Sequence, residues 1–519
     1  MSKRDNPLVL ILALAATLGL IGGGLWVLSK AAPDLVPNLS SQSQTKAAKG
    51  ELRILGDTFS GYSTFRSQPF QEALEEVGLK LEYQDEFDQA KRAELLNQGK
   101  ADLLVTTLDQ FLQQQPEGQI IGLIDRTVGA DAVVLNTKKY PNLKSLLDLK
   151  RLVEQERSQG RQLTLTFAGD TPSEYLALVL STKFEAFKLA DFQVEKVADA
   201  SEAWQLLQDP NQNVAVAVIW EPYVTQAKKQ GHTVVLSSQD APQAIVDVIV
   251  ASNRLIESQP EKISELLEAY YRRIDVNVRE PSQLKTQIAE DGELSSSEAS
   301  AVLQGIDFFT ASEAQQWMSD NILEKRIGST AAVLVLAGRL NDVPQAPQSL
   351  FSPQFLTKAA NNTETLISLV RADNPELADR LSGKGETVAA VPQVSAQQIT
   401  AAPDIGNLEV RGEVKFGVGS ATLTSQGQQT LNQLATEIQE FNPQTLAVRV
   451  IGHTSKTGAA ALNQTLSQKR AQVVVNYLKN RGLKHNLVAE GKGFNQPLSG
   501  IPPTDPRQQR TEIRLVRVN

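Results

Sequence analysis

Hydrophobic positions first form one uninterrupted run near the start of the chain, from Leu8 to Leu28, without a charged residue. A helix rises about 1.5 Å per residue, so a helix of this length spans the hydrocarbon core of a bilayer. Lys3 and Arg4 precede the run, and the positive-inside rule then keeps the N-terminus in the cytoplasm. The pattern predicts a cytoplasmic tail at 1–7, a single transmembrane helix at 8–29 in the inner membrane, and a periplasmic location for the rest.

A cleaved signal peptide is the alternative for this apolar run. The run is long for a signal peptide, and Ser29 to Asp34 offers no clean small-x-small cleavage site, which favours a retained helix. Residues 30–50 are rich in Pro, Ser and Gln. This composition predicts a flexible linker that holds the next domain away from the membrane.

In residues 51–345, short apolar runs alternate with segments of helical period. The expected strands lie at 52–55, 80–84, 101–107 and 163–169, with an amphipathic helix near 68–78. This alternation predicts an α/β domain built on a parallel sheet. Ligands of such sheets bind beyond the carboxyl ends of the strands, which points to the loops at Ser60-Gly61-Tyr62, at Thr106-Thr107 and after residue 169.

The loop after residue 169 leads directly into an apolar helix. Thr171 fits the N-cap position and Pro172 the first helical position. The start of the helix would offer free amide donors and a partial positive charge to an anionic ligand group. A plain helix cap without a ligand explains the same residues equally well.

The rest of the chain divides into a Pro/Gln/Ala-rich stretch and a second domain. Residues 346–405 predict a semi-flexible linker with a short helix at 363–372. Residues 406–519 predict a smaller α+β domain of β-α-β-α-β order. Its strands are expected at 408–416, at 446–454 and near the C-terminus, and its helices at 426–441 and 459–481.

Charge and composition narrow the possible functions. The 519 residues carry a net charge of −8, yet residues 406–519 hold 14 Lys+Arg and 7 Asp+Glu. This basic end suggests an anionic partner, with chance surface composition as the alternative. The absence of Cys excludes disulfides and thiolate metal sites, and only three His residues argue against a histidine metal centre or triad. We expect no metal, no cofactor and no nucleic-acid partner.

Within residues 51–345, three stretches carry a resemblance to a known family through their sequence and their order along the chain; they lie at 130–150, 169–180 and 214–250. They resemble two-lobed periplasmic solute-binding proteins of the nitrate/taurine/thiamine-precursor type, most sharply at Trp220-Glu221-Pro222-Tyr223. The resemblance implies a type 2 periplasmic-binding-protein fold in which two α/β lobes close on a small molecule. It also implies binding rather than catalysis, with an ABC permease as a partner.

Candidate solute contacts follow from the strand-end loops and from this resemblance. They are Ser60, Gly61, Tyr62, Thr106, Thr107, Thr171, Ser173, Trp220, Glu221 and Asp247, with Asp131 as a further negative charge. Trp220 has interlobe packing as its alternative role, and Glu221 a structural salt bridge. Donors at a helix end beside carboxylates suit a zwitterion or a cationic ring equally. No nucleophile, phosphate-loop or zinc-protease motif indicates an enzyme.

The C-terminal domain contains FGVGSATLTSQG, IGHTSKTGAAALNQTLSQKRAQVVVNYLKNRG and VAEGKGFNQP. These motifs resemble OmpA-like domains, which bind peptidoglycan. In that family an acidic residue after His-Thr and an arginine in the following helix grip the zwitterionic end of diaminopimelate. The resemblance assigns this role to Thr454, Ser455, Asn463, Arg470 and Arg510.

This chain departs from the family pattern at two of those positions. Ser455 stands where the acidic residue belongs, and Gln508-Gln509-Arg510 replaces Asn-Arg-Arg. A serine cannot form the charge-assisted bond to an ammonium group, so we expect weak wall binding; a degenerate domain kept for spacing or oligomerisation is the alternative. The sequence thus predicts a membrane-anchored periplasmic protein that binds a small solute and contacts peptidoglycan. The alternative is a structural tether from membrane to wall with a vestigial solute domain.

Overall fold

The computed structural model describes residues 50–383, 391–417 and 419–518. Residues 50–519 form one compact unit. The predicted transmembrane helix at 8–29 and almost all of the linker at 30–50 lie outside the described residues. Within the described ranges, no helix combines the length and the apolar character that a membrane crossing requires.

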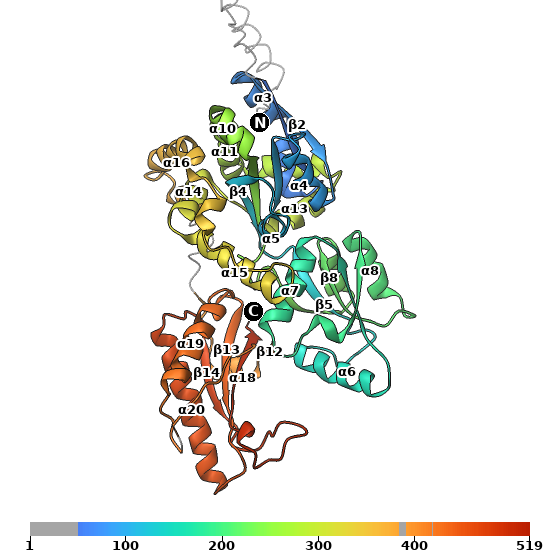
Figure 1. The fold of residues 1–519 in the computed structure, drawn as a ribbon, viewed down its shortest axis with the longest axis vertical. Coiled ribbons are helices and arrows are strands. Elements are labelled where there is room, and N and C mark those ends of the chain that lie inside the picture. The colour runs from blue at the N-terminus through green and yellow to red at the C-terminus, as the bar shows by residue number, and fades with distance from the viewer. Residues whose placement is uncertain (1–49, 384–390, 418, 519) are drawn as a thin grey trace, which may run out of the picture. The chain divides into compact units, whose positions relative to one another are not determined.

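The first lobe is built on a six-stranded sheet with the order β11-β4-β10-β3-β1-β2 (Figure 1). Its strands are β1 (Gly50–Gly56), β2 (Leu79–Asp85), β3 (Leu103–Thr107), β4 (Gly118–Thr127), β10 (Val246–Ser252) and β11 (Ile306–Phe308). β1 pairs in parallel with β2 and β3, whereas β10 runs antiparallel to β3 and β4. The sheet is therefore mixed rather than purely parallel, because β10 re-enters the first lobe from the opposite direction.

The second lobe has a five-stranded sheet with the order β7-β6-β8-β5-β9. Its strands are β5 (Asp131–Leu135), β6 (Thr164–Ala168), β7 (Gln193–Val197), β8 (Val214–Trp220) and β9 (Thr233–Ser237). The chain enters this lobe between β4 and β5 and returns between β9 and β10. Two α/β lobes joined by two chain crossings confirm the predicted two-lobed fold.

Helices cover both sheets (Figure 1). The first lobe has α2 (Ser63–Arg66), α3 (Gln68–Glu76), α4 (Gln89–Asn97), α5 (Leu108–Gln114), α10 (Asn253–Ser258), α11 (Pro260–Arg279), α12 (Pro281–Asp291), α13 (Ser296–Gln304), α14 (Ala311–Ser319) and α15 (Ile322–Leu336). The second lobe has α6 (Leu146–Ser158), α7 (Pro172–Lys183), α8 (Ala200–Gln208) and α9 (Tyr223–Lys229). Every residue of β10 is buried, as expected for a central strand covered on both faces.

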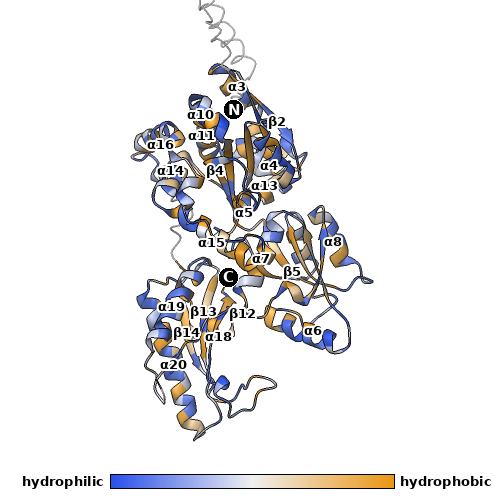
Figure 2. Ribbon diagram, viewed as in Figure 1, coloured by the Kyte–Doolittle hydropathy of each residue, from blue (hydrophilic) through white to orange (hydrophobic). Residues whose placement is uncertain are grey.

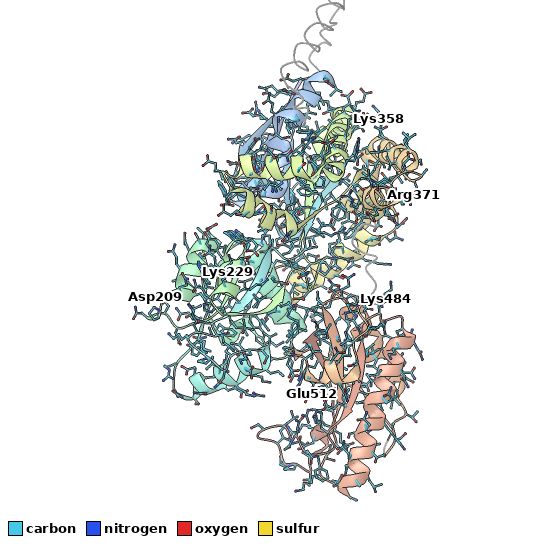
Figure 3. All side chains as sticks on the ribbon, turned by 180° about the vertical axis from the view of Figure 1, so that it is seen from behind. Asp209, Lys229, Lys358, Arg371, Lys484 and Glu512 are labelled. Carbon is cyan, nitrogen blue, oxygen red and sulfur yellow. The ribbon has the colours of Figure 1, made fainter. Side chains whose placement is uncertain are left out.

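Hydropathy follows this layering. The central strands of each sheet are apolar, and polar residues lie on the outward helices (Figure 2). Charged side chains such as Lys229, Lys358 and Arg371 are exposed (Figure 3). The lobes are therefore held mainly by burial of their strands against amphipathic helices.

Residues 346–405 differ from the predicted linker. Much of the segment forms α16 (Thr357–Val370) and α17 (Pro375–Leu381), after two short 3-10 turns. Phe355, Leu356 and Ala360 are buried in the core of the first lobe. Apolar residues spaced by three and four positions give the start of this segment one core-facing stripe, so α16 packs as part of the first lobe. Ile399 of 396–401 packs instead against the C-terminal sheet.

The C-terminal domain has a four-stranded sheet with the order β12-β15-β13-β14. Its elements are α18 (Ala396–Ala401), β12 (Asp404–Asn407), α19 (Ser425–Ile438), β13 (Leu446–Gly452), α20 (Ala460–Asn480), β14 (Leu487–Gly491) and β15 (Thr511–Arg517). The strand predicted at 408–416 is not formed. Instead, the Glu409 amide donates to the Lys183 carbonyl at 2.8 Å, and Arg411 donates to the Thr182 carbonyl, also at 2.8 Å.

Those bonds belong to a larger contact between the second lobe and the C-terminal domain. Phe184 meets Phe441 edge to face with 5.9 Å between ring centroids. The buried Asp240 carboxylate accepts from Arg517 Nη2 at 2.6 Å and from Thr445 Oγ1 at 2.9 Å. Apolar residues of both parts form one continuous core, so the two are packed together rather than separated by a spacer.

Candidate functional site

Residues at three strand ends of the first lobe come together as the sequence predicts. The Tyr62 hydroxyl, just after β1, donates to the Asp247 carboxylate at the start of β10. Asp247 pairs with Thr107 and Val248 with Thr106 across β10 and β3. Tyr62, Asp247 and both threonines are buried, whereas Ser60 is partly exposed. The structure thus brings these loops together, although Asp247 arrives on an antiparallel strand, and their contact with a solute stays a prediction.

Asp125 on β4 completes this cluster and was missed by the sequence analysis. It is fully buried, and neither carboxylate oxygen accepts a bond from an N–H or hydroxyl donor among the described residues; its side chain interacts with the Asp247 carboxyl. Burial, reinforced by the negative charge of Asp247, raises the pKa of Asp125 well above its ordinary value. A Cβ on Gly61 would lie 2.3 Å from Asp125 Oδ2, so only glycine fits there. The sequence feature that could have indicated Asp125 is the charged residue that ends the apolar run IIGLID.

The second lobe contributes Asp131 and Ser173. The Ser173 hydroxyl at the start of α7 donates to Asp131 Oδ1 at 3.0 Å, and both residues are buried. Burial raises the pKa of Asp131 to about 7, although the hydrogen bond from Ser173 opposes the shift. Thr171 occupies the N-cap position of α7, but its side chain accepts no hydrogen bond from the helix. Its hydroxyl donates instead to the Ala168 carbonyl at 2.8 Å.

The start of α7 already faces a carboxylate. Glu174 Oε2 accepts from the Asp170 amide at 2.9 Å, and its carboxylate also pairs with Lys196 at 2.8 Å and Arg339 at 2.6 Å. A negative charge near a helix N-terminus is stabilising. The plain structural role weighed in the sequence analysis therefore describes this helix end better than an anion site does.

Trp220 and Glu221 at the end of β8 serve local structure. The Glu221 carboxylate accepts from the Thr225 amide at 3.0 Å and from the Thr225 hydroxyl at 2.9 Å. These bonds link the end of β8 to the first turn of α9. Trp220 is half-buried against the apolar cluster of the second lobe. Both side chains thus have partners within their own lobe.

Acidic side chains gather in the region where the lobes face each other. The carboxyls of Asp57, Asp109 and Asp131 all act electrostatically on Asp247, whose pKa is raised well above its ordinary value chiefly by burial. Burial also raises the pKa of Asp109 to about 6. The buried Arg92 balances one of these carboxyls, with Nη2 3.0 Å from Asp57 Oδ2. The arrangement suits a ligand that brings positive charge.

In the C-terminal domain, Gln509 joins the two residues expected to grip the wall peptide. Arg470 Nη1 donates to Gln509 Oε1 at 3.2 Å, and Gln509 Nε2 donates to Ser455 Oγ at 3.4 Å. Arg470 Nε also donates to the Ser420 carbonyl at 2.9 Å, and the guanidinium lies over the Phe416 ring. Burial lowers the pKa of Arg470 from its ordinary value. The structure thus brings Ser455 and Arg470 together through Gln509, which the sequence analysis did not name, and their contact with peptidoglycan stays a prediction.

Asn463, Thr454 and Arg510 have different surroundings. Asn463 Nδ2 donates to the Thr457 carbonyl at 2.7 Å, so it holds the loop that carries Ser455. The buried Thr454 hydroxyl has no partner among the described residues. Arg510 donates to Glu512 Oε1 from Nε at 3.0 Å and to the Gln496 carbonyl from Nη2 at 3.1 Å. The structure therefore does not join Arg510 to the Arg470 site.

Comparisons with known proteins identify both domains. Residues 74–284 match the NMT1/THI5-like family, and residues 415–511 match the OmpA family. The chain is thus similar to the NMT1/THI5-like family in its two-lobed part and to the OmpA family in its C-terminal domain, as both resemblances predict.

Individual relatives cover only parts of the chain. Outer membrane protein A of Shimwellia blattae is 37% identical over 105 residues, which are 20% of this chain and 44% of that protein. The chain therefore spans less than half the length of that relative. Among solved structures, the periplasmic aliphatic sulphonate binding protein SsuA from Escherichia coli is 17% identical to this chain and aligns with a TM-score of 0.46. The alignment covers 58% of this chain and 92% of the SsuA chain. A periplasmic sulfonate-binding protein SsuA from Methylobacillus flagellatus is 15% identical and aligns with a TM-score of 0.47, over 61% of this chain and 96% of that chain.

Proposed function

We propose that this chain binds a small cationic or zwitterionic solute between its two α/β lobes and contacts peptidoglycan through its OmpA-family domain. The observation that carries the solute class is the set of buried carboxyls at the facing strand ends, above all Asp125, Asp131 and Asp247. An ammonium group that enters there would let these carboxyls ionise and form charge-assisted bonds. A sulfonate would find no opposite charge among these carboxyls.

Thermal unfolding of residues 50–519 in the presence of candidate solutes tests this proposal. The panel pairs primary amines, quaternary ammonium compounds and zwitterionic amino acids with alkanesulfonates of matched size. A ligand that binds the native state alone raises the melting temperature in proportion to its occupancy. We expect a shift from a cation or zwitterion, and its loss in Asp247→Asn. A shift produced by a sulfonate alone would contradict the proposed solute class.

One observation favours the structural alternative, a tether without a working solute site. Several predicted solute contacts already have internal partners: Tyr62 with Asp247, Ser173 with Asp131, and Glu221 with Thr225. If no member of the panel shifts the melting temperature while sacculi are still bound, the tether becomes the better description.

Wall contact is the second half of the proposal, and its support is the OmpA-family match together with the basic charge of residues 406–519. Weak binding is expected because Ser455 lacks a charge. The apolar run from Leu8 to Leu28 supports a place at the periplasmic side of the inner membrane, where an ABC permease would be the partner for solute. Fractionation of the full-length chain after alkaline extraction tests the anchor.

A further inference from the structure

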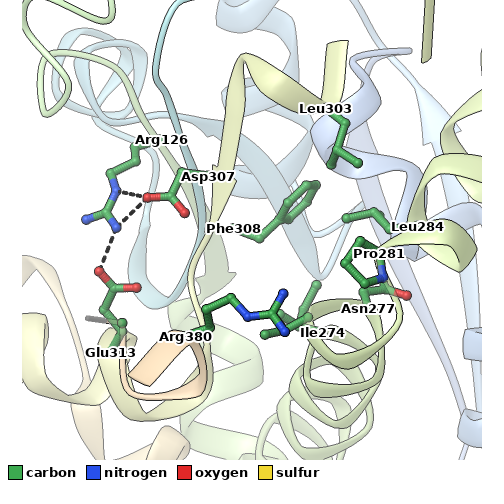
Figure 4. Close-up of a pocket in the computed structure, with 12 residues that line it drawn as sticks. Arg126, Ile274, Asn277, Pro281, Leu284, Leu303, Asp307, Phe308, Glu313 and Arg380 are labelled. Atoms are coloured by element: carbon green, nitrogen blue, oxygen red, sulfur yellow. Dashed lines mark hydrogen bonds and ion pairs between the residues drawn. The ribbon is translucent and has the colours of Figure 1, made fainter. Parts of the chain in front are cut away.

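The first lobe contains a cavity of about 210 Å³ bordered by α11, α12, α13, β11 and α17 (Figure 4). It is separate from the interlobe site, because none of the predicted solute contacts lines it. Sites for drug-sized ligands measure about 300–1,000 Å³, so this volume limits an occupant to a small molecule.

One side of the cavity is apolar. Its walls are formed by Ile274, Val278, Pro281, Leu284, Leu303 and Phe308. Ile274, Leu284 and Phe308 belong to the buried core, so this wall is fixed in place by the packing behind it. An apolar chain placed against it would lose its contact with water, which favours binding.

A buried amide lies in the same wall. Asn277 is only 2% exposed and lines the cavity, yet neither its Nδ2 nor its Oδ1 has a hydrogen-bond partner among the described residues. Burying an amide without a partner is unfavourable, and most buried amides are satisfied. A polar group entering the cavity would remove that penalty.

Among the described residues that line the cavity, one of the two arginines is left without an ion-pair partner. Arg126 lies between two carboxylates, with Nη2 2.6 Å from Asp307 Oδ2 and 2.7 Å from Glu313 Oε1. Burial raises the pKa of Glu313 to about 7, against the opposing effect of Arg126. The guanidinium of Arg380 reaches from α17 toward α11 (Figure 4), and it pairs with no described residue. The unpaired charge of the cavity is thus positive.

We propose that this cavity is a second ligand site, which binds a small amphipathic carboxylate. The carboxylate accepts from the Arg380 guanidinium and from the Asn277 amide, while the alkyl chain lies against the apolar wall. Charge-assisted bonds supply the orientation, and burial of the chain supplies the affinity. The site does not depend on the solute proposed for the interlobe region.

Saturation-transfer NMR with hexanoate on residues 50–519 tests this proposal, since these residues form a compact unit of their own. We expect saturable binding to the wild type. Arg380→Gln should weaken it about tenfold, the effect of losing one hydrogen bond to a charged group. Leu303→Trp should abolish it by filling the apolar side. Hexylammonium, with the charge reversed, should not bind there.

Two control variants separate this cavity from other surfaces. Arg151→Gln makes the same charge change on an exposed arginine of α6 and should leave hexanoate binding unchanged. Asp247→Asn alters the interlobe carboxyl cluster and should also leave hexanoate binding unchanged. Absence of saturable binding to the wild type, or equal binding by wild type and Arg380→Gln, would overturn the proposal. Loss of hexanoate binding in Asp247→Asn would overturn it as well, by assigning hexanoate to the interlobe region.

Discussion

At the scale of single residues, Gln509 offers the proposed wall-binding site the same hydrogen-bonding groups as a zwitterionic ligand would. Its amide oxygen accepts from Arg470, and its amide nitrogen donates toward Ser455. A zwitterion with a carboxylate and an ammonium group would present the same acceptor and donor to the same two residues. Bonds of 3.2 and 3.4 Å are long for side-chain amides, so a charged competitor should displace Gln509.

Co-sedimentation of residues 50–519 with purified peptidoglycan sacculi tests this role. We expect Gln509→Ala to bind more tightly, because it frees Arg470, and Ser455→Asp to gain about tenfold through a charge-assisted bond. Arg470→Ala should stay in the supernatant. Gln472→Ala changes an exposed glutamine on the same domain and serves as the matched control. Weaker binding by Gln509→Ala would show that Gln509 supports the site instead of competing for it.

Asp131 should make stability depend on pH. Its pKa is about 7 in the folded chain and about 3.8 in a free aspartate, so the folded state holds the proton over a range where the unfolded state has lost it. The contribution of Asp131 to stability is therefore complete below pH ~4 and is lost as the pH rises through ~7. Asp131→Asn keeps the shape but cannot ionise.

Urea unfolding between pH 4 and 8 measures this effect. The wild type should lose on the order of 3 kcal/mol more than Asp131→Asn over that range, by the conversion of about 1.4 kcal/mol per pKa unit. Asp170→Asn, an exposed aspartate at the adjacent turn, should keep the wild-type profile. Identical pH profiles for wild type and Asp131→Asn would show that Asp131 is ionised in the folded state.

At the scale of elements, α16 shows what a composition-based linker prediction overlooks. Pro, Gln and Ala around it indicate a spacer, yet its own apolar residues have helical spacing and find a groove on the first lobe. Composition describes the average of a segment, whereas packing depends on a few positions. The loss of the predicted strand at 408–416 has a related cause, since the Glu409 amide and the Arg411 guanidinium both bond to carbonyls of the second lobe, more than 200 residues away.

Two leucines of this segment provide a sharp test. Leu356 is 0% exposed and Leu369 is 72% exposed. Leu356→Ala should lower the free energy of unfolding by about 2–5 kcal/mol, the usual cost of emptying a core leucine site. Leu369→Ala should change it by less than about 0.5 kcal/mol. Urea unfolding followed by tryptophan fluorescence measures both. Equal, small effects would restore the linker interpretation.

At the scale of the whole chain, the sequence predicted the domain types better than the site contacts. Strand–helix alternation and spaced motifs are local patterns, so the two lobes and the C-terminal domain could be found without the structure. Tyr62 and Asp247 are 185 residues apart, and no local spacing indicates that they bond. Asp125 and Gln509 were missed for the same reason, because their roles depend on neighbours supplied by other elements.

An ion pair between the partly exposed Arg517 and the fully buried Asp240 joins the second lobe to the C-terminal domain. Removing one partner of such a pair costs about 3–5 kcal/mol, because the other charge stays buried and unpaired. Arg517→Gln leaves Asp240 in that state, so we expect calorimetry to show the C-terminal domain unfolding earlier, as a separate transition. Arg507→Gln, on an exposed arginine of the same domain, is the control. An unchanged calorimetric profile for Arg517→Gln would show that the contact contributes little.

The most direct test of the central claim is isothermal titration of residues 50–519 with the amine or zwitterion that gives the largest thermal shift. We predict saturable binding with one site per chain, its loss in Asp247→Asn and its retention in Arg470→Ala, since the wall site is separate. Heat from a sulfonate with none from any cation, or solute binding that survives in Asp247→Asn, would contradict an acidic solute site between the lobes.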